Sequence, residues 1–303
     1  MVMTQRQANW ILATVSMAWG ASYIFMKLCV DEIPPITIVA LRFGIAFIVM
    51  LAIFFKKIIH VNTKTLIYSA IVGTLLCGIF IALMYGVKST TASTAGFLTS
   101  TTVILVPVLQ TFITHKLPSQ KIVWGILIVT TGLALLIIGD DFNLASGSLY
   151  CLLAALLYAI HIIVTNRFVR EVDALQLGIY QLGFATTYAI ILTLLLETPV
   201  LPGDAIHWFA ILGLALICSA YGFVMQPIAQ QYTTPESAGF LFSLEPIFSA
   251  ILAFIFLHEN MGLQGYFGAL LILTGVLIAN SISKKQRQMR ITKEIGKVAE
   301  DRH

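Results

Sequence analysis

The chain has 303 residues, of which 58% are hydrophobic and 11% are charged. Soluble domains are about 45–50% apolar and near 25% charged, so this composition excludes an ordinary soluble protein. The formal net charge of +4 comes from basic residues that are spread along the chain, and it therefore gives no indication of a nucleic-acid partner.

Ten apolar stretches follow one another along the chain, each close to the roughly 20 residues that a membrane-spanning helix needs. The sequence predicts them at 9–28, 34–55, 65–86, 94–114, 120–138, 147–166, 174–196, 206–228, 236–257 and 262–280. They are continuously apolar, whereas the strands of a membrane barrel alternate between apolar and polar residues. We therefore expect an all-α integral membrane protein with ten transmembrane helices.

The distribution of Lys and Arg predicts the orientation in the membrane, because cytoplasmic loops are enriched in these residues. With the N-terminus inside, fifteen of them fall on the cytoplasmic side, and only Lys27 and Lys88 fall outside. Seven acidic residues also fall outside: Asp31, Glu32, Asp140, Asp141, Glu197, Asp204 and Glu259. We expect a multi-pass protein of the cytoplasmic membrane with both termini in the cytoplasm.

The chain contains an internal repeat. An offset of 143 residues aligns STTASTAGFLTS (89–100) with YTTPESAGFLFS (232–243), and an offset of 139 aligns Trp19 with Tyr158. The sequence thus predicts one five-helix repeat at 1–139, a second at 140–281 and a basic cytoplasmic tail at 282–303. Because five is odd, the second repeat is inverted relative to the first. Inverted repeats are typical of secondary transporters, although some channels also carry them.

Three stretches resemble the ten-helix transporters of the drug/metabolite superfamily, in its EamA-like branch. They are ALRFGIAFIVML (40–51), TASTAGFLTSTTVILVPVLQTF (91–112) and SAGFLFSLEPIFSAILAFIFLHENMGLQGYFGALLILTGVLIA (237–279). The resemblance covers essentially the whole chain. It implies a transporter that moves small metabolites, such as amino acids or related amphipathic compounds, usually outward.

Glu245 lies about ten residues into the stretch 236–257, which places it near the middle of the membrane. An unpaired charge there costs at least about 2.5–3.5 kcal/mol. Three roles are open: a proton carrier, a counter-charge for a substrate amine, or one half of a structural ion pair. The partner in the last case is Arg42, which could instead reach an interface or bind a substrate carboxylate.

Proline is the second unusual residue in these helices. Pro246 and Pro107 each remove a backbone donor inside a predicted span, and we expect a helix kink at each. The carbonyl groups that a kink frees can be satisfied by side chains or water, or can face a substrate path.

Side chains with an apolar body and a polar atom are further candidates for a central path: Trp19, Tyr23, Tyr85, Tyr158 and Tyr221. The alternative for such residues is an aromatic belt at the membrane interface. His161, deep in 147–166, is either a hydrogen-bonded packing residue or a proton relay.

No HExxH, GxSxG or P-loop pattern is present, and the four cysteines have no metal-ligand spacing. We therefore expect neither enzyme activity nor a metal or cofactor, with an intramembrane lipid-modifying enzyme as a distant alternative. The expected partners are the lipid bilayer, a small-molecule substrate, and a proton or another coupling ion. A facilitative uniporter, an exchanger or a channel is the second class of function.

Glycine pairs at 125/132 and 268/275 are packing or dimer contacts, so a monomer and a homodimer both remain open.

Overall fold

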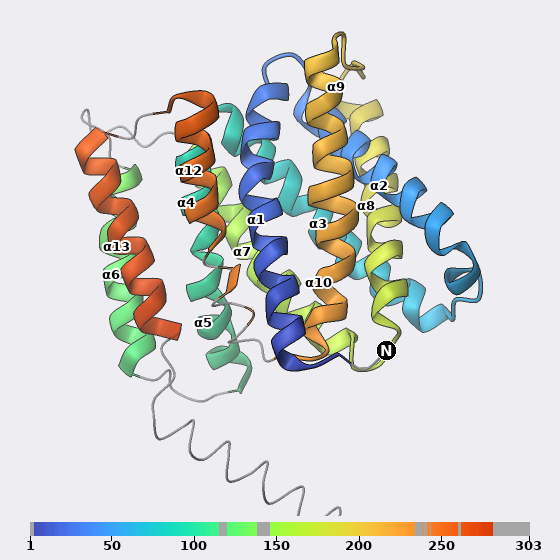
Figure 1. The fold of residues 1–303 in the computed structure, drawn as a ribbon, viewed down its shortest axis with the longest axis horizontal. Helices are drawn as coiled ribbons and strands as arrows, with labels where there is room; N and C mark the ends of the chain where they lie inside the picture. The colour runs from blue at the N-terminus through green and yellow to red at the C-terminus, as the bar shows by residue number, and fades with distance from the viewer. Residues whose placement is uncertain are drawn as a thin grey trace, which may run out of the picture.

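The computed structural model describes residues 3–114, 120–137, 146–233, 238, 241–242, 244–259 and 262–280. Every regular element among them is a helix (Figure 1). The helices are α1 (Gln5–Cys29), α2 (Pro35–Ile58), α3 (Thr63–Lys88), α4 (Ala92–Ser100), α5 (Thr102–Thr114), α6 (Gln120–Ile137), α7 (Ser146–Phe168), α8 (Ala174–Leu196), α9 (Ala205–Leu212), the π-helix η1 (Gly213–Tyr221), α10 (Gly222–Gln230), α12 (Glu245–Leu257) and α13 (Gly262–Asn280). The predicted tail at 282–303 lies outside the described residues.

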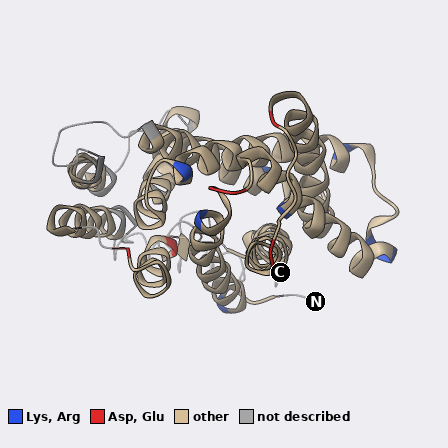
Figure 2. Ribbon diagram, turned by 90° about the horizontal axis from the view of Figure 1, so that it is seen from above, with Lys and Arg blue, Asp and Glu red and all other residues tan. Residues whose placement is uncertain are grey.

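Seven described segments are long and apolar enough to cross a membrane: Gln5–Cys29, Pro35–Ile58, Thr63–Lys88, Ala92–Ile113, Gly147–Phe168, Ala174–Leu196 and Ala205–Gln230. Three shorter apolar helices lie at Val123–Gly132, Glu245–Leu257 and Gly262–Gly275. The ten apolar segments of the described chain confirm the all-α membrane fold. Seen from above, the ribbons are almost entirely uncharged (Figure 2).

The outer faces of these helices are apolar. Phe112, Leu195 and Leu263 are 71%, 73% and 80% exposed, and many Ile, Leu and Phe side chains accompany them. A soluble monomer rarely exposes apolar patches beyond a few hundred Å². The lipid bilayer is therefore the environment that covers this surface.

Polar residues start several of the helices by accepting backbone N–H groups that have no partner inside the helix. Asn62 accepts from Thr65 N at the start of α3, and Asp173 accepts from Gln176 N at the start of α8. Asp204 caps α9 through the N–H of His207, and this bond holds the pKa of the Asp204 carboxyl below its usual value.

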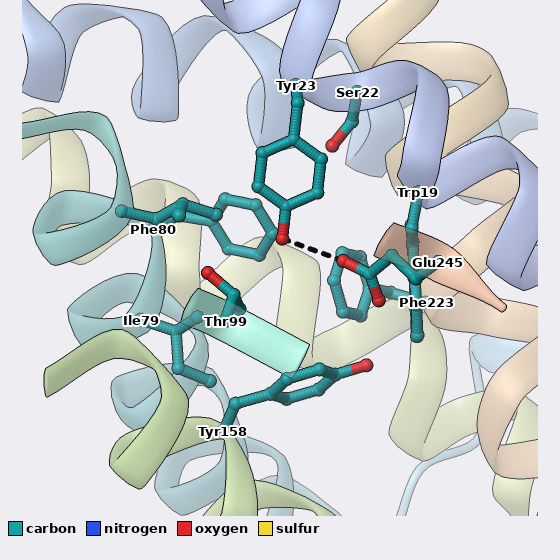
Figure 3. A pocket seen from close by; sticks show the side chains of 10 residues that line it. Trp19, Ser22, Tyr23, Ile79, Phe80, Thr99, Tyr158, Phe223 and Glu245 are labelled. Atoms are coloured by element: carbon teal, nitrogen blue, oxygen red, sulfur yellow. Dashed lines mark hydrogen bonds between the residues drawn. The ribbon is translucent and has the colours of Figure 1, made fainter. Parts of the chain in front are cut away.

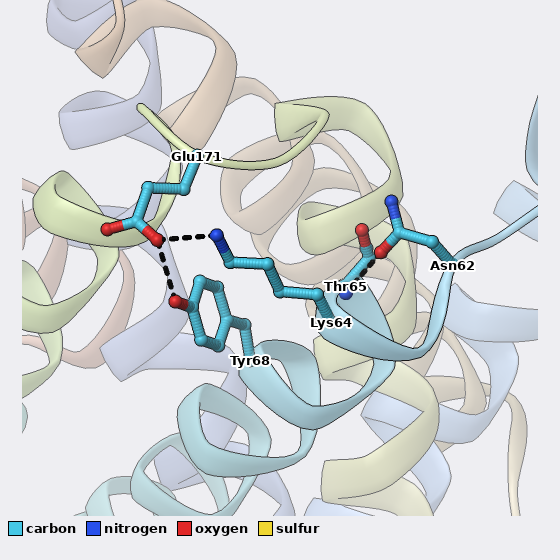
Figure 4. Close-up of polar contacts among 5 residues, drawn as sticks. All are labelled: Asn62, Lys64, Thr65, Tyr68 and Glu171. Carbon is cyan, nitrogen blue, oxygen red and sulfur yellow. Dashed lines mark hydrogen bonds and ion pairs between the residues drawn. The ribbon is translucent and has the colours of Figure 1, made fainter.

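An exposed cluster joins the first turn of α3 to the connector between α7 and α8 (Figure 4). The Glu171 carboxylate lies 2.8 Å from Lys64 Nζ and accepts the Tyr68 hydroxyl at 2.7 Å. The hydrogen bond from Lys64, followed by that from Tyr68, keeps the pKa of Glu171 below its usual value. Because the pair is exposed, it adds little stability.

Two helix pairs form the edges of the bundle, α6 with α13 and α2 with α8 (Figure 1). Glycines bring the first pair together: a Cβ on Gly132 would lie 2.6 Å from Gly268 O, and one on Gly275 would lie 2.8 Å from Gly125 O. The two predicted glycine pairs therefore pack against each other within one chain, as small residues do between membrane helices.

The fourth span is broken into α4 and α5 at Thr101. Hydroxyl groups donate back to the preceding turn here: Thr99 to Ala95 O, Ser100 to Phe97 O and Thr101 to Leu98 O. Such bonds compete with the helical ladder and bend helices. Pro107, the predicted kink, lies six residues further on, inside α5.

The eighth span, predicted at 206–228, consists of α9, η1 and α10 in succession. Its central segment is a nine-residue π-helix, Gly213–Tyr221. π-Helical turns are rare, and they occur frequently at functional sites. Nothing in the apolar pattern of the sequence distinguishes this segment from an α-helix.

The ninth span contains a helix that begins at Glu245, with Leu244 as its N-cap and Pro246 in its first turn. Proline is favoured at the first helical position because its missing N–H would have no partner there. Acidic side chains are also favoured in the first turn by the helix dipole. The Glu245-Pro246 pair is thus a helix start within the membrane.

Candidate functional site

A cavity of about 20 Å³ lies between α1, α3, α4, α7, α10 and α12 (Figure 3). Its walls are Trp19, Ser22, Tyr23, Ile79, Phe80, Leu83, Thr99, Tyr158, Phe223 and Glu245. This volume accommodates about one water molecule, whereas pockets for small ligands measure about 300–1,000 Å³. A ligand of ordinary size therefore fits only when the surrounding helices move apart.

Glu245 supplies the one carboxylate among the lining residues. Its Oε1 accepts the Tyr23 hydroxyl at 2.8 Å (Figure 3), and the two residues are 7% and 1% exposed. The carboxylate also stands in the first turn of α12, where the partial positive charge of a helix N-terminus stabilises an anion. Both interactions hold a negative group inside an apolar bundle.

Aromatic rings form much of the cavity wall. The Trp19 ring centroid lies 4.9 Å from that of Phe223 and 5.8 Å from that of Tyr158. The Trp19 indole N–H donates to Cys218 O, in the π-helix, at 3.0 Å. Aromatic faces attract cations through the ring quadrupole. Together with Glu245, they suit a ligand that has a cationic group and an apolar body.

Arg42 is fully buried behind the wall of the cavity. Its Nε donates to Ser219 Oγ at 3.0 Å, its Nη1 to Met26 Sδ at 3.6 Å, and its Cζ lies 4.1 Å from the ring centroid of Phe80. No ion pair joins it to Glu245 in the described structure. A neutral hydroxyl and an aromatic face therefore hold this charge.

His161 is fully buried beside the cavity. Its Nε2 lies 3.1 Å from Gln181 Oε1, and Gln181 Nε2 donates to Phe223 O at 2.8 Å. Because the amide oxygen of Gln181 is the acceptor, we assign the proton to Nε2 of His161. This chain of bonds fixes the histidine against a residue that lines the cavity.

The structure brings together four of the predicted residues, since Trp19, Tyr23, Tyr158 and Glu245 all line the cavity. Two other candidates lie elsewhere. Tyr85 is half-buried with its ring centroid 5.8 Å from that of Tyr150, and the Tyr221 hydroxyl lies 2.6 Å from Thr14 Oγ1.

Sequence reasoning missed six lining residues: Ser22, Ile79, Phe80, Leu83, Thr99 and Phe223. A signal existed for two of them. The 143-residue offset of the internal repeat pairs Phe80 with Phe223, and their ring centroids lie 5.5 Å apart at an interplanar angle of 89°. Extending the repeat alignment into the third and eighth spans would have identified this pair.

Polar groups continue from the cavity along one face of α7 and one face of α10. Spacings of three, four and seven residues place side chains on the same helix face. Five residues on these faces have a buried polar atom that no described protein atom partners: Tyr158, His161, Thr165, Gln226 and Gln230. Such atoms normally bind water or a ligand, so these faces suit a polar path.

No group of three or more His, Cys, Asp or Glu side chains that could hold a metal ion occurs in the described part of the chain. The four cysteines, Cys29, Cys77, Cys151 and Cys218, are free and buried. Burial raises the cost of forming a thiolate, so these residues are suited to packing.

Comparisons with known proteins agree with this architecture. The model of the EamA-like transporter family matches residues 7–138 and 145–281. An uncharacterized transporter of Archaeoglobus fulgidus is 27% identical over 277 residues, covering 89% of this chain and 84% of the relative. The uncharacterized transporter YetK of Bacillus subtilis is 26% identical over 302 residues, covering 94% and 90%. A solved crystal structure with 17% identity superposes with a TM-score of 0.69, covering 93% of this chain and 98% of that one.

Proposed function

Because the chain belongs to the EamA-like transporter family, we propose that it is a secondary active transporter that exports small amphipathic metabolites, such as amino acids or related compounds, by alternating access. The observation that carries this proposal is the Glu245 carboxylate, bonded to Tyr23 inside an aromatic cavity at a helix start. It is the group in the cavity that can exchange a proton for a cationic substrate group.

The carboxylate sets the chemistry of the site. A substrate amine would meet Glu245 while the apolar body of the substrate packs against Trp19, Phe223 and Tyr158. When no amine is present, a proton would neutralise the same carboxylate, because an unpaired charge in mid-membrane costs at least about 2.5–3.5 kcal/mol. Substrate and proton would thus compete for one group, which couples their movements in opposite directions.

Two inverted five-helix repeats, 1–139 and 140–281, would provide the moving halves. The contacts between repeat-equivalent residues support this division. Trp19 meets Tyr158, and Phe80 meets Phe223, as expected if a pseudo-two-fold axis passes through the cavity. Rocking about that axis would open the cavity to each side in turn.

The distribution of Lys and Arg supports an orientation in the cytoplasmic membrane with both termini on the cytoplasmic side. In this orientation α7 and α10 end on the cytoplasmic side. The unpartnered polar groups of Thr165, Gln226 and Gln230 then lie between the cavity and the cytoplasm, where a polar substrate would enter.

Reconstitution into liposomes tests the proposal. Liposomes containing the purified protein would be loaded with one unlabelled amino acid or amine at a time from a panel. Entry of the same compound in labelled form would then be followed. We expect saturable counterflow in the wild type. Glu245→Gln should abolish accumulation driven by a pH gradient, because the amide cannot carry a proton. It should also weaken exchange, because the amide removes the counter-charge for a substrate amine. Glu171→Gln, on an exposed connector, is the matched control and should behave as the wild type.

Three outcomes would contradict the proposal. Unchanged gradient-driven accumulation in Glu245→Gln would remove the proton role of this residue. Single-channel currents without counterflow would identify a channel, and saturable movement that ignores every ion gradient would identify a facilitative uniporter or exchanger.

A further inference from the structure

Glu259 ties the end of α12 to the start of α4. Its carboxylate accepts the backbone N–H of Ala92 at 2.8 Å, that of Ser93 at 3.0 Å, and the Ser93 hydroxyl at 2.8 Å. Three donors from another helix therefore converge on one side chain. Hydrogen bonds to a carboxylate are about twice as strong as bonds between neutral groups.

The rest of the contact between α4 and α12 is equally close. Ser249 Oγ donates to Ala92 O at 3.2 Å, so Ala92 is held at both its N–H and its carbonyl. A Cβ on Gly96 would lie 2.7 Å from Ser249 Oγ. Both helices line the cavity, α4 through Thr99 and α12 through Glu245. Separating them would therefore open one end of the cavity.

The backbone before Glu259 is specialised for this contact. His258 has φ 53° and ψ 29°, the left-handed region, and it is the one non-glycine residue with positive φ in the described structure. The Glu259 N–H reaches back to Ala253 O at 3.3 Å, which closes the end of α12. This tight end turns the carboxylate toward α4.

A second carboxylate makes the same bonds elsewhere. Glu197, after α8, accepts the N–H of Ile36 at 3.0 Å, the N–H of Thr37 at 2.9 Å and the Thr37 hydroxyl at 3.1 Å, at the start of α2. No residue of α2 or α8 lines the cavity. The two carboxylates bind the same kinds of donor, two backbone N–H groups and one hydroxyl. Glu197 also interacts with Tyr85 of α3, but the two helices that it joins through these three bonds lie away from the cavity.

We infer that Glu259 is a gate residue: its bonds to Ala92 and Ser93 hold the outer end of the cavity closed, and they must break in each transport cycle. Glu197 instead holds a peripheral helix pair that stays together. The inference rests on the proposed alternating access and orientation, in which Glu197 and Glu259 both face the outside.

Accessibility of a cysteine introduced in the cavity tests the gate without any substrate. Thr99→Cys would be treated with a membrane-impermeant maleimide in right-side-out vesicles, and the labelled cysteine would be identified by mass spectrometry, since the native cysteines are buried. Adding Glu259→Gln should raise the labelling rate at least about tenfold, the change expected from losing one charge-assisted hydrogen bond. Adding Glu197→Gln should leave the rate within about twofold.

A reversible cross-link tests the need for opening. Ser93→Cys with Glu259→Cys, joined by a short bifunctional methanethiosulfonate, should stop counterflow of the panel compounds, and a reductant should restore it. The same cross-link between Thr37→Cys and Glu197→Cys should leave counterflow unchanged.

The inference is overturned if Glu259→Gln does not increase labelling, if Glu197→Gln increases it equally, or if the cross-link at Glu259 leaves transport intact. Labelling needs no substrate. If the uncross-linked wild type shows no counterflow, the proposed function is contradicted. The labelling experiment still tests whether Glu259 closes the cavity.

Discussion

Tyr23→Phe isolates the hydrogen bond at the centre of the cavity. The substitution keeps the ring and removes the hydroxyl that donates to Glu245 Oε1 at 2.8 Å. Both residues are buried, at 1% and 7% exposure. Hydrogen bonds to charged groups contribute about 1.5–3 kcal/mol. We expect Tyr23→Phe to lower the free energy of unfolding by this amount.

Tyr221→Phe is the matched control, because it removes a hydroxyl that lies 2.6 Å from Thr14 Oγ1. The Thr14 hydroxyl keeps its bond to Ile11 O at 2.8 Å, and both residues are partly exposed. The loss of a neutral hydrogen bond in such a place costs about 0.5–1.5 kcal/mol. The two Tyr→Phe substitutions should therefore differ measurably.

The assay is equilibrium unfolding of the purified protein in mixed micelles by titration with sodium dodecyl sulfate, at mildly alkaline pH, which favours the carboxylate over the carboxylic acid. Each substitution would also be made in a Glu245→Gln background. There the cost of Tyr23→Phe should fall to about 1 kcal/mol, because a neutral acceptor remains. Equal costs in the two backgrounds, or a cost no larger than that of Tyr221→Phe, would refute the reasoning.

Three further predictions use the same titration. Gly20→Ala should cost about 1–3 kcal/mol, because its Cβ would lie 2.6 Å from Phe248 Cβ, whereas Gly203→Ala, with no atom within 4 Å, should stay within about 0.5 kcal/mol. Gln226→Leu removes two buried polar atoms without a partner; it should not lower stability, and it should slow counterflow. The lowered pKa of Glu171 means that its bonds stabilise the fold at neutral pH and are lost as pH falls through that pKa, so Glu171→Gln should flatten the stability curve in acid.

The membrane fold was predictable because it depends on length and composition. A helix of roughly 20 apolar residues satisfies every backbone group by itself in lipid, so each span is encoded locally. The cavity was predictable only in part. Trp19, Tyr23, Tyr158 and Glu245 are conspicuous because polar atoms are costly in lipid, whereas Ile79 and Leu83 look like any packing residue until the helices are placed.

The hydrogen-bond partners of Arg42 and Trp19 were not predictable from the sequence, because they depend on backbone geometry. Arg42 bonds Ser219, and Trp19 bonds the carbonyl of Cys218, both within the π-helix Gly213–Tyr221. A π-helix shifts the register of hydrogen bonds and side chains, and no apolar pattern encodes that shift. One of the three roles that the sequence left open for Glu245 was an ion pair with Arg42. In the described structure Glu245 accepts from Tyr23 and Arg42 donates to Ser219.

The two predicted kink residues differ in their position relative to the helix starts: Pro246 lies in the first turn of α12, whereas Pro107 lies inside α5. Span four resumes as α5, Thr102–Thr114, and span nine contains α12, Glu245–Leu257. The 143-residue offset of the repeat relates these two helices at both ends, although Pro107 and Pro246 occupy different positions in them. The helix start in mid-membrane is thus common to both halves.

What differs between the halves is the residue at that start. Thr102 donates its hydroxyl to Ala155 O at 2.9 Å, a bond that joins α5 to α7. At the equivalent position, Glu245 places a carboxylate in the cavity and accepts from Tyr23. A helix start in mid-membrane can stabilise an anion through its dipole, so the repeated architecture prepares two such positions, and this chain has placed its charge at one of them.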